Sequence, residues 1–189
     1  IRDLGYREIF KDFSIDLVNQ LIKYHRINGG LSRYVKIRYF YEKLLGREIS
    51  DNKVDQLAEQ FSAIMRPKLK DRSIIINEAL SFVKRCYKKI PLHIVSGSEQ
   101  DELRCVCEFI EIGSYFLTIE GSPTSKNDLV SSVLSSYGYD SEKTILIGDT
   151  INDYDAAKSN KVIFYAYNNG SMKDLCNRYI YNFDEVFFN

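Results

Sequence analysis

Residues 145–153 read ILIGDTIND, a short apolar run that ends in a glycine and is followed by two aspartates four positions apart. The apolar run predicts a buried strand, and Gly148 permits a tight backbone turn at its end. Asp149 is then expected at the rim of a sheet, and Asp153, at the start of the next helix, can face the same cleft. Two carboxylates in this arrangement suit Mg²⁺, which prefers hard oxygen ligands. A turn residue followed by a helix-start residue is an equally common use of two aspartates.

Short apolar segments separated by helical segments make up the sequence from about residue 73 onward. Strands are expected at residues 92–95, 115–118, 144–147 and 162–166, and helices at residues 77–89, 99–110, 126–137 and from 152 onward. Strands joined by crossover helices form a parallel sheet with helices on both faces, so the predicted fold class is α/β and Rossmann-like. Ligands of such sheets bind beyond the carboxyl ends of the strands. Functional residues are therefore expected in the loops that follow the strands.

Two further loops at this predicted edge carry polar residues. Ser96 and Gly97 follow the first predicted strand, and the serine hydroxyl with the glycine N–H can hold a phosphate oxygen. Ser98 is interpreted as the cap of the next helix, and His93, inside the strand, as a structural histidine. Lys126 begins a helix, where the helix dipole disfavours positive charge, so this lysine is better placed if it faces an anion. A lone lysine at such a position is otherwise a surface residue.

The first 72 residues show a helical pattern only. Helices are expected from Ser14 to about residue 28, from about residue 32 to residue 45, and from residue 50 or 51 to about Pro67. Each begins at a serine or aspartate that can cap it, and apolar residues recur at the helical period. The sequence therefore predicts a helical cap over residues 1–72 and an α/β core over residues 73–189.

The composition shows no strong charge bias. Lysine and arginine together number 26, as do aspartate and glutamate, which argues against a nucleic-acid or anionic-membrane binder. No apolar run reaches the roughly 18 residues of a membrane span, and the N-terminal residues lack the pattern of a signal peptide. The four cysteines have the spacing of neither a zinc site nor a disulfide framework. A reduced, cytoplasmic protein is expected, and its oligomeric state is left open. A small phosphorylated metabolite remains compatible with zero net charge, because a single pocket can be positive.

Taken together, Ser96, Lys126 and the Asp149–Asp153 pair resemble, in order and spacing, the second, third and fourth motifs of the haloacid dehalogenase superfamily of phosphohydrolases. The helical part resembles the cap that members of the phosphoglycolate phosphatase and β-phosphoglucomutase type carry after their first core strand. The resemblance implies that Ser96 and the Gly97 N–H bind phosphate, and that Lys126 stabilises the nucleophile and the transferring phosphoryl group. It also implies that Asp149 and Asp153 hold Mg²⁺, directly or through water, in a reaction with a phospho-aspartyl intermediate.

The first motif of that superfamily, an apolar strand that ends in Asp-x-Asp, has no match in the sequence. The nearest segment, residues 9–14, contains a single aspartate and has a helical pattern. The resemblance places this strand at the centre of the sheet, with its first aspartate as the nucleophile. We therefore expect the core to lack its first strand and the nucleophile to be encoded upstream of Ile1. A non-catalytic, metabolite-binding relative is the alternative.

The helical part also yields a prediction about the substrate. Residues 30–36, GLSRYVK, resemble the Gly-x-Ser-Arg substrate loop in the caps of β-phosphoglucomutase-like proteins. By that resemblance Arg33 and Lys36, with Arg38 nearby, hold a second, non-reacting anionic group of a sugar phosphate. A solvated basic face of a helix is the alternative interpretation of these residues. The expected function is a Mg²⁺-dependent phosphatase for a small sugar phosphate, with a phosphosugar mutase of the same superfamily as the alternative.

Overall fold

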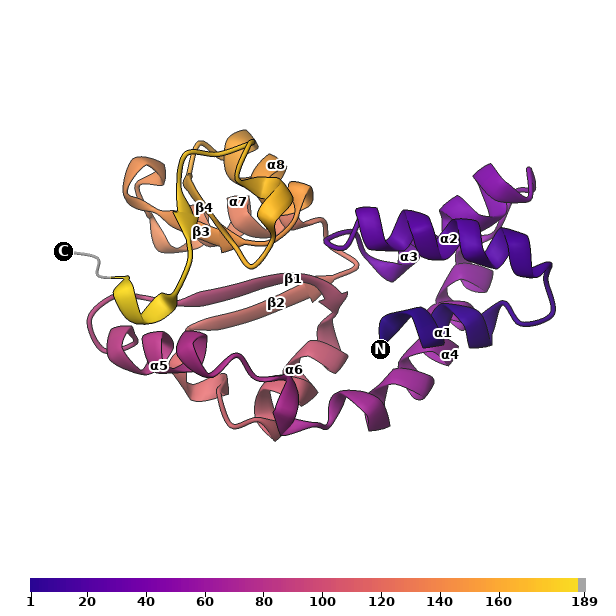
Figure 1. Cartoon of the computed structure of the whole chain (residues 1–189), viewed down its shortest axis with the longest axis horizontal. Coiled ribbons are helices and arrows are strands. Elements are labelled where there is room, and N and C mark those ends of the chain that lie inside the picture. The colour runs from indigo at the N-terminus through magenta and orange to yellow at the C-terminus, as the bar shows by residue number, and fades with distance from the viewer. Residues whose placement is uncertain (187–189) are drawn as a thin grey trace.

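The computed structural model describes residues 1–186, without the side chains of Ile74 and Glu185, and its N-terminal part is helical. The helices of this part lie together at one side of the molecule in Figure 1. They are α1 (Arg2–Ile9), α2 (Ile15–Ile27), α3 (Arg33–Tyr39), which continues as the π-helical turn Phe40–Leu44, and α4 (Asp51–Leu69). No strand is found within residues 1–69.

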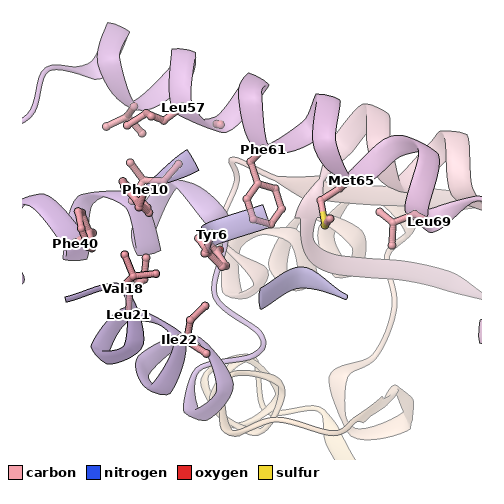
Figure 2. Close-up of a cluster of buried hydrophobic side chains, with 13 residues drawn as sticks. Tyr6, Phe10, Val18, Leu21, Ile22, Phe40, Leu57, Phe61, Met65 and Leu69 are labelled. Carbon is pink, nitrogen blue, oxygen red and sulfur yellow. The ribbon is translucent and has the colours of Figure 1, made fainter. Parts of the chain in front are cut away.

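The predicted caps start three of these helices, and one apolar cluster holds the helices together. Ser14, Ser32 and Ser50 cap α2, α3 and α4, and each side chain accepts a hydrogen bond from a backbone N–H in the first turn. Figure 2 shows the apolar side chains of different helices pointing toward one another. The buried members of the cluster are Tyr6, Phe10, Val18, Leu21, Ile22, Ile37, Phe40, Val54, Leu57, Ala58, Phe61, Met65 and Leu69. The helical part therefore has a hydrophobic core of its own.

From α5 onward the chain alternates helices and parallel strands, with short 3-10 turns between some of them. The elements are α5 (Asn77–Cys86), β1 (His93–Glu99), α6 (Gln100–Phe109), β2 (Thr118–Ser122), α7 (Lys126–Tyr137), β3 (Ile145–Gly148), α8 (Ile151–Ser159), β4 (Ile163–Tyr167) and β5 (Tyr179–Ile180). β1 pairs with β2, β3 with β4 and β4 with β5, all in parallel. Helices α6 and α7 both pack on β1 and β2, with α6 below and α7 above these strands in Figure 1. These elements confirm the predicted α/β, Rossmann-like class.

The parallel strands form two sheets instead of one. The first contains β1 and β2, the second contains β3, β4 and β5, and no backbone ladder joins β1 to β3. Both sheets nevertheless share one core, because Val95 of β1 packs against the apolar cluster that includes Leu146 and Phe164 of the second sheet. The break lies between β1 and β3. The sequence predicts that the core lacks its central strand. That strand itself remains a prediction.

The second strand starts later than predicted. The pattern indicated residues 115–118, but β2 begins at Thr118 because its parallel pairing with β1 starts there, opposite His93. Residues 113–115 form a 3-10 turn instead. The prediction was wrong because the strand is defined by its partner, and β1 begins only at His93, opposite Thr118.

The first strand is longer than predicted. It was expected to end at Val95, but β1 extends to Glu99 past an irregularity in its pairing after Val95. Ser96 and Gly97 are therefore residues of an irregular strand end, not of a free loop. The strand continues this far because, after the irregularity, Glu99 again pairs with a residue of β2, Ser122.

The predicted boundary between residues 72 and 73 falls in the 3-10 turn Arg72–Ile74, between α4 and α5. The division of the chain into a cap over residues 1–72 and a core after it remains a prediction. None of the helices within residues 1–186 has the length and apolar composition of a membrane-spanning segment.

Candidate active site

The two aspartates of the ILIGDTIND segment lie where β3 turns into α8. Thr150 caps α8 in a capping box with Asp153. Asp153 Oδ2 accepts hydrogen bonds from the Thr150 N–H at 3.0 Å, the Thr150 hydroxyl at 2.6 Å and the Asp149 N–H at 3.3 Å. A Cβ on Gly148 would lie 2.3 Å from the Asp153 Cβ, so only glycine lets this carboxylate fold back over the end of the strand. Asp153 is 5% exposed and is held in one orientation by these bonds.

Lys126 provides the charge opposite Asp153. It is the first residue of α7, which Ser125 caps by accepting a hydrogen bond from the Asp128 N–H at 3.2 Å. The Lys126 Nζ donates a hydrogen bond to Asp153 Oδ1, and both side chains are largely buried. The expectation that Lys126 faces an anion instead of the solvent is confirmed, and this anion is Asp153.

Asp149 differs from Asp153 in its surroundings. The residue is exposed at the rim, but the nearby protein removes part of the water around its carboxyl group. This partial burial, and then the charge of Asp153, raise the pKa of Asp149, while Lys126 opposes the shift. A divalent cation beside Asp149 would relieve both unfavourable effects.

These two carboxylates fit Mg²⁺ as a partial ligand set. Within residues 1–186, no group of three or more His, Cys, Asp or Glu side chains lies close enough together to hold a metal ion. Both oxygens of Asp153 already accept hydrogen bonds, so Asp149 is the better direct ligand and Asp153 the better ligand through water. Mg²⁺ keeps several waters and binds phosphate oxygens in many sites, so two protein carboxylates are compatible with it.

The end of β1 carries a second group of polar residues. The Ser98 N–H donates to Ser96 Oγ at 3.1 Å, the Ser96 hydroxyl donates to Ser98 Oγ at 3.1 Å, and Arg2 Nη2 donates to Ser98 Oγ at 2.9 Å. The sequence suggested Ser98 as the cap of α6, and this prediction is wrong. Glu99 caps that helix, because its carboxylate accepts from the N–H groups of Asp101 and Glu102, whereas Ser98 Oγ accepts from Arg2 and Ser96.

His93 is a structural residue, as expected. Its Nδ1 lies 2.8 Å from Thr118 Oγ1 and its Nε2 lies 3.1 Å from the Tyr139 hydroxyl, so both ring nitrogens are engaged. Partial burial lowers the pKa of His93.

The loop between α2 and α3 bridges the two strand ends. A Cβ on Gly97 would lie 2.2 Å from the Gly30 carbonyl oxygen, and a Cβ on Gly30 would lie 2.5 Å from Thr150 Oγ1. The Gly30 backbone therefore rests on the end of β1 and on the start of α8 at the same time. Beside it is a hollow of about 230 Å³, whose lining includes Gly97, Lys126 and Asn152. Gly97 and Lys126 thus line the same hollow. The convergence of Ser96 and Asp149 on one bound phosphate remains a prediction.

Gly97→Ala is expected to displace this loop, because the added methyl group overlaps a backbone oxygen that has no rotamer to change. We expect the free energy of unfolding to fall by about 1–3 kcal/mol, as for other overpacked contacts. Amide exchange within residues 29–32 should also become faster. Gly170→Ala is the matched control, since nothing lies within 4 Å of a Cβ at Gly170. Equal behaviour of the two variants in urea unfolding and hydrogen exchange would contradict this packing.

Arg33 and Lys36 are buried, at 3% and 2% exposed, so their interpretation as a solvated basic face is wrong. Arg33 reaches from α3 to α6, where its Nη2 lies 2.7 Å from Glu102 Oε1. Its Nη1 donates to Ser62 Oγ at 2.5 Å, and its guanidinium lies 4.6 Å from the centre of the Phe61 ring. Both side chains are therefore shielded from water. Their contact with a substrate remains a prediction.

Arg38 lies outside this buried group. It is half-exposed, and its guanidinium is in ion pairs with Glu42 and Asp51. It is therefore the one member of the predicted basic group that fits the surface interpretation.

Three residues around the site were not identified from the sequence: Thr150, Arg2 and Glu102. Thr150 has a local signature, a threonine followed three positions later by an aspartate, which is typical of a capping box. Glu102 has no such signature, because its partner Arg33 belongs to a distant helix. Arg2, which lies 3.6 Å from Glu102 Oε1, is equally remote from it in the sequence.

The family described as haloacid dehalogenase-like hydrolase matches the chain over residues 7–167, which include Ser96, Lys126, Asp149 and Asp153. The chain belongs to the haloacid dehalogenase-like hydrolase family. The residues that carried the resemblance lie at the ends of β1 and β3 and at the starts of α7 and α8.

Solved structures share the fold of this hydrolase. The β-phosphoglucomutase of Clostridium difficile has a TM-score of 0.77 at 13% identity, covering 99% of this chain and 86% of that one. A haloacid dehalogenase hydrolase of family IA, variant 3, from Entamoeba histolytica has a TM-score of 0.76 at 21% identity, covering 99% and 88%. A phosphatase, described as predicted, from Clostridium acetobutylicum has a TM-score of 0.72 at 14% identity, covering 97% and 86%. No curated protein sequence matches the chain significantly.

Proposed function

We propose that this hydrolase is a Mg²⁺-dependent phosphatase that acts on a small phosphorylated metabolite of the sugar phosphate type. The observation that carries the proposal is the buried Lys126–Asp153 pair beside Asp149 at the carboxyl end of β3. A fixed cation next to two carboxylates is suited to a metal-bound phosphate, whose oxygens need both positive charge and a rigid frame.

In this proposal each residue has a defined role. Ser96 and the Gly97 N–H donate hydrogen bonds to phosphate oxygens from the β1 side. Lys126 donates to the phosphoryl group and to the nucleophile from the α7 side. Asp149 and Asp153 hold Mg²⁺, which when bound neutralises charge on the phosphate oxygens. Arg33 and Lys36 are the candidates for contact with the rest of the substrate.

The nucleophile in this proposal is an aspartate at the end of a strand that pairs with both β1 and β3. The absence of a ladder between those two strands supports this position, since both have an edge facing it. The aspartate oxygen bonds to phosphorus as the ester bond to the leaving oxygen breaks, and that oxygen takes a proton from an acid. Water then attacks the phospho-aspartate and releases phosphate and the free carboxylate.

Phosphate release from a panel of phosphomonoesters by the intact protein tests the proposal. Release is expected with Mg²⁺ and should fall to background with excess EDTA, because charge on the transferring group is then not neutralised. Conversion of a sugar 1-phosphate to its 6-phosphate without net release would identify a mutase instead. No turnover of any ester, with ligand binding retained, would favour the non-catalytic relative.

A further inference from the structure

Asp149 lies one residue beyond the last paired residue of β3. The parallel ladder between β3 and β4 ends at Gly148, which pairs with Ala166. Helix α8 does not continue the support at once, because its first turn bonds to the carbonyl oxygen of Thr150 and not to that of Asp149. Within residues 1–186, the backbone of Asp149 is therefore held by neither the sheet nor the helix, although this residue is the proposed direct ligand of Mg²⁺.

Two side chains hold the Asp149 backbone instead. Its N–H donates to Asp153 Oδ2 at 3.3 Å, and its carbonyl oxygen accepts from Asn169 Nδ2 at 2.7 Å. Asn169 belongs to the segment after β4 and lies 20 positions further along the chain. The two bonds hold the peptide groups on either side of the Asp149 Cα atom, so together they restrict rotation of the backbone there.

The surroundings of Asn169 fix the direction of its amide group. Its Oδ1 accepts from the Ser171 N–H at 3.2 Å and from the Ser171 hydroxyl at 2.8 Å, and the residue caps the 3-10 turn Gly170–Met172. A backbone N–H only donates and a carbonyl oxygen only accepts, so the amide oxygen faces Ser171 and the nitrogen faces Asp149. Asn168, just before it, has a φ of 56°, in the left-handed region that asparagine tolerates better than most residues. The chain turns there, and Asn169 reaches the end of β3.

Folding alone does not require a side-chain partner for this carbonyl oxygen. Asp149 is exposed at the rim, where water can donate to the oxygen at little cost. Its carboxyl group is the part that needs restraint, since it forms no ion pair with any residue in the described part of the chain. Partial burial, and then the charge of Asp153, raise the pKa of Asp149, so a free side chain would turn away from Asp153 toward the solvent. A hydrogen bond on the Asp149 backbone opposes that movement.

We propose that Asn169 is a positioning residue, whose hydrogen bond to the Asp149 carbonyl oxygen holds the Asp149 carboxylate at the rim where the proposed function requires Mg²⁺. The inference rests on that proposed function and adds to its site a residue that acts through Asp149. Outer hydrogen bonds of this kind orient metal ligands, and their loss typically weakens metal binding by about 10- to 100-fold. The expected signature is weaker metal binding by a protein that is otherwise folded as before.

Two substitutions of Asn169 remove this bond and retain the turn. Asn169→Asp and Asn169→Ser both keep an oxygen that can accept from the Ser171 N–H, and both lack the amide donor. The two variants differ in charge. The added carboxylate of Asn169→Asp would by itself attract a cation, so weaker binding in both variants excludes a simple charge effect.

Asn182→Asp and Asn182→Ser are the matched controls. Asn182 caps the 3-10 turn Phe183–Glu185 in the same way, since its Oδ1 accepts from the Asp184 N–H at 2.8 Å. Among the described residues it forms no hydrogen bond with Asp149. The controls therefore alter a turn cap by the same chemistry without touching the proposed metal ligand.

Mg²⁺ affinity of the intact protein is measured by calorimetry, and amide exchange of the metal-free protein by mass spectrometry. Both Asn169 variants should bind Mg²⁺ about tenfold or more weakly than the wild-type protein. Amide exchange within residues 148–151 should become faster without metal, because the Asp149 backbone has lost one of its two restraints. Both Asn182 variants should keep the wild-type affinity and the wild-type exchange in that segment.

Unchanged Mg²⁺ affinity in Asn169→Ser would overturn the proposal, as would unchanged exchange within residues 148–151. An equal loss of affinity in Asn182→Ser would also overturn it, because the effect would then be a general one of altered turn caps. Failure of the phosphatase proposal appears elsewhere, as the absence of Mg²⁺-dependent phosphate release from esters by the wild-type protein. Neither the binding measurement nor the metal-free exchange requires turnover, so the two failures are distinguishable.

Discussion

Replacing Glu102 with glutamine is expected to lower the free energy of unfolding by about 3–5 kcal/mol, the usual cost of breaking a buried ion pair from one side. Glu102 is 2% exposed and faces the guanidinium groups of Arg33 and Arg2. Glutamine keeps the shape of the side chain but leaves buried Arg33 without a negative charge. Urea unfolding of the wild-type protein and the variant at pH 7 measures the difference.

The control is Glu108→Gln, which removes an exposed carboxylate from the same helix. Its effect should stay within about 0.5 kcal/mol, as for most surface substitutions. The double variant Glu102→Leu with Arg33→Met should recover part of the loss, because it removes both charges together. If Glu102→Gln costs no more than Glu108→Gln, the ion pair between α3 and α6 does not stabilise the fold.

The parts of the site that could be predicted from the sequence depend on local physical chemistry. Lys126 begins α7 as expected, because Ser125 beside it can accept a hydrogen bond from the first turn of the helix. Asp149 and Asp153 lie at the end of β3 because an apolar run, a glycine and a capping threonine define a strand, a turn and a helix start. These signals act over a few residues and can be recognised in one sequence.

The features that could not be predicted depend on contacts between distant segments. The start of β2 at Thr118 is decided by its partner His93, and the cap of α6 at Glu99 by how far β1 continues. The burial of Lys36 and Arg33 follows from the packing of α3 near α6, which no pattern within residues 30–36 indicates. The same basic residues on an exposed helix would read identically in the sequence.

Asp149→Asn in the intact protein is expected to reduce Mg²⁺-dependent phosphate release by about a hundredfold or more, because metal neutralisation of the phosphate contributes several kcal/mol. Asparagine keeps the size of the side chain and one oxygen, so the end of β3 should remain folded. In the absence of metal the variant should be at least as stable as the wild-type protein, since the repulsion between Asp149 and Asp153 is removed. Added Mg²⁺ should raise the melting temperature of the wild-type protein but no longer that of the variant.

Asp155→Asn provides the comparison for this prediction. Asp155 is exposed on α8, two positions after Asp153, and among the described residues it forms no hydrogen bond or ion pair with Asp149 or Lys126. Its replacement changes the net charge by the same amount, so it separates loss of a metal ligand from loss of general negative charge. Both activity and the Mg²⁺-dependent rise in melting temperature should survive in Asp155→Asn. If Asp149→Asn also retains both, the metal does not bind at the end of β3, and Lys126 and Asp153 form a structural ion pair.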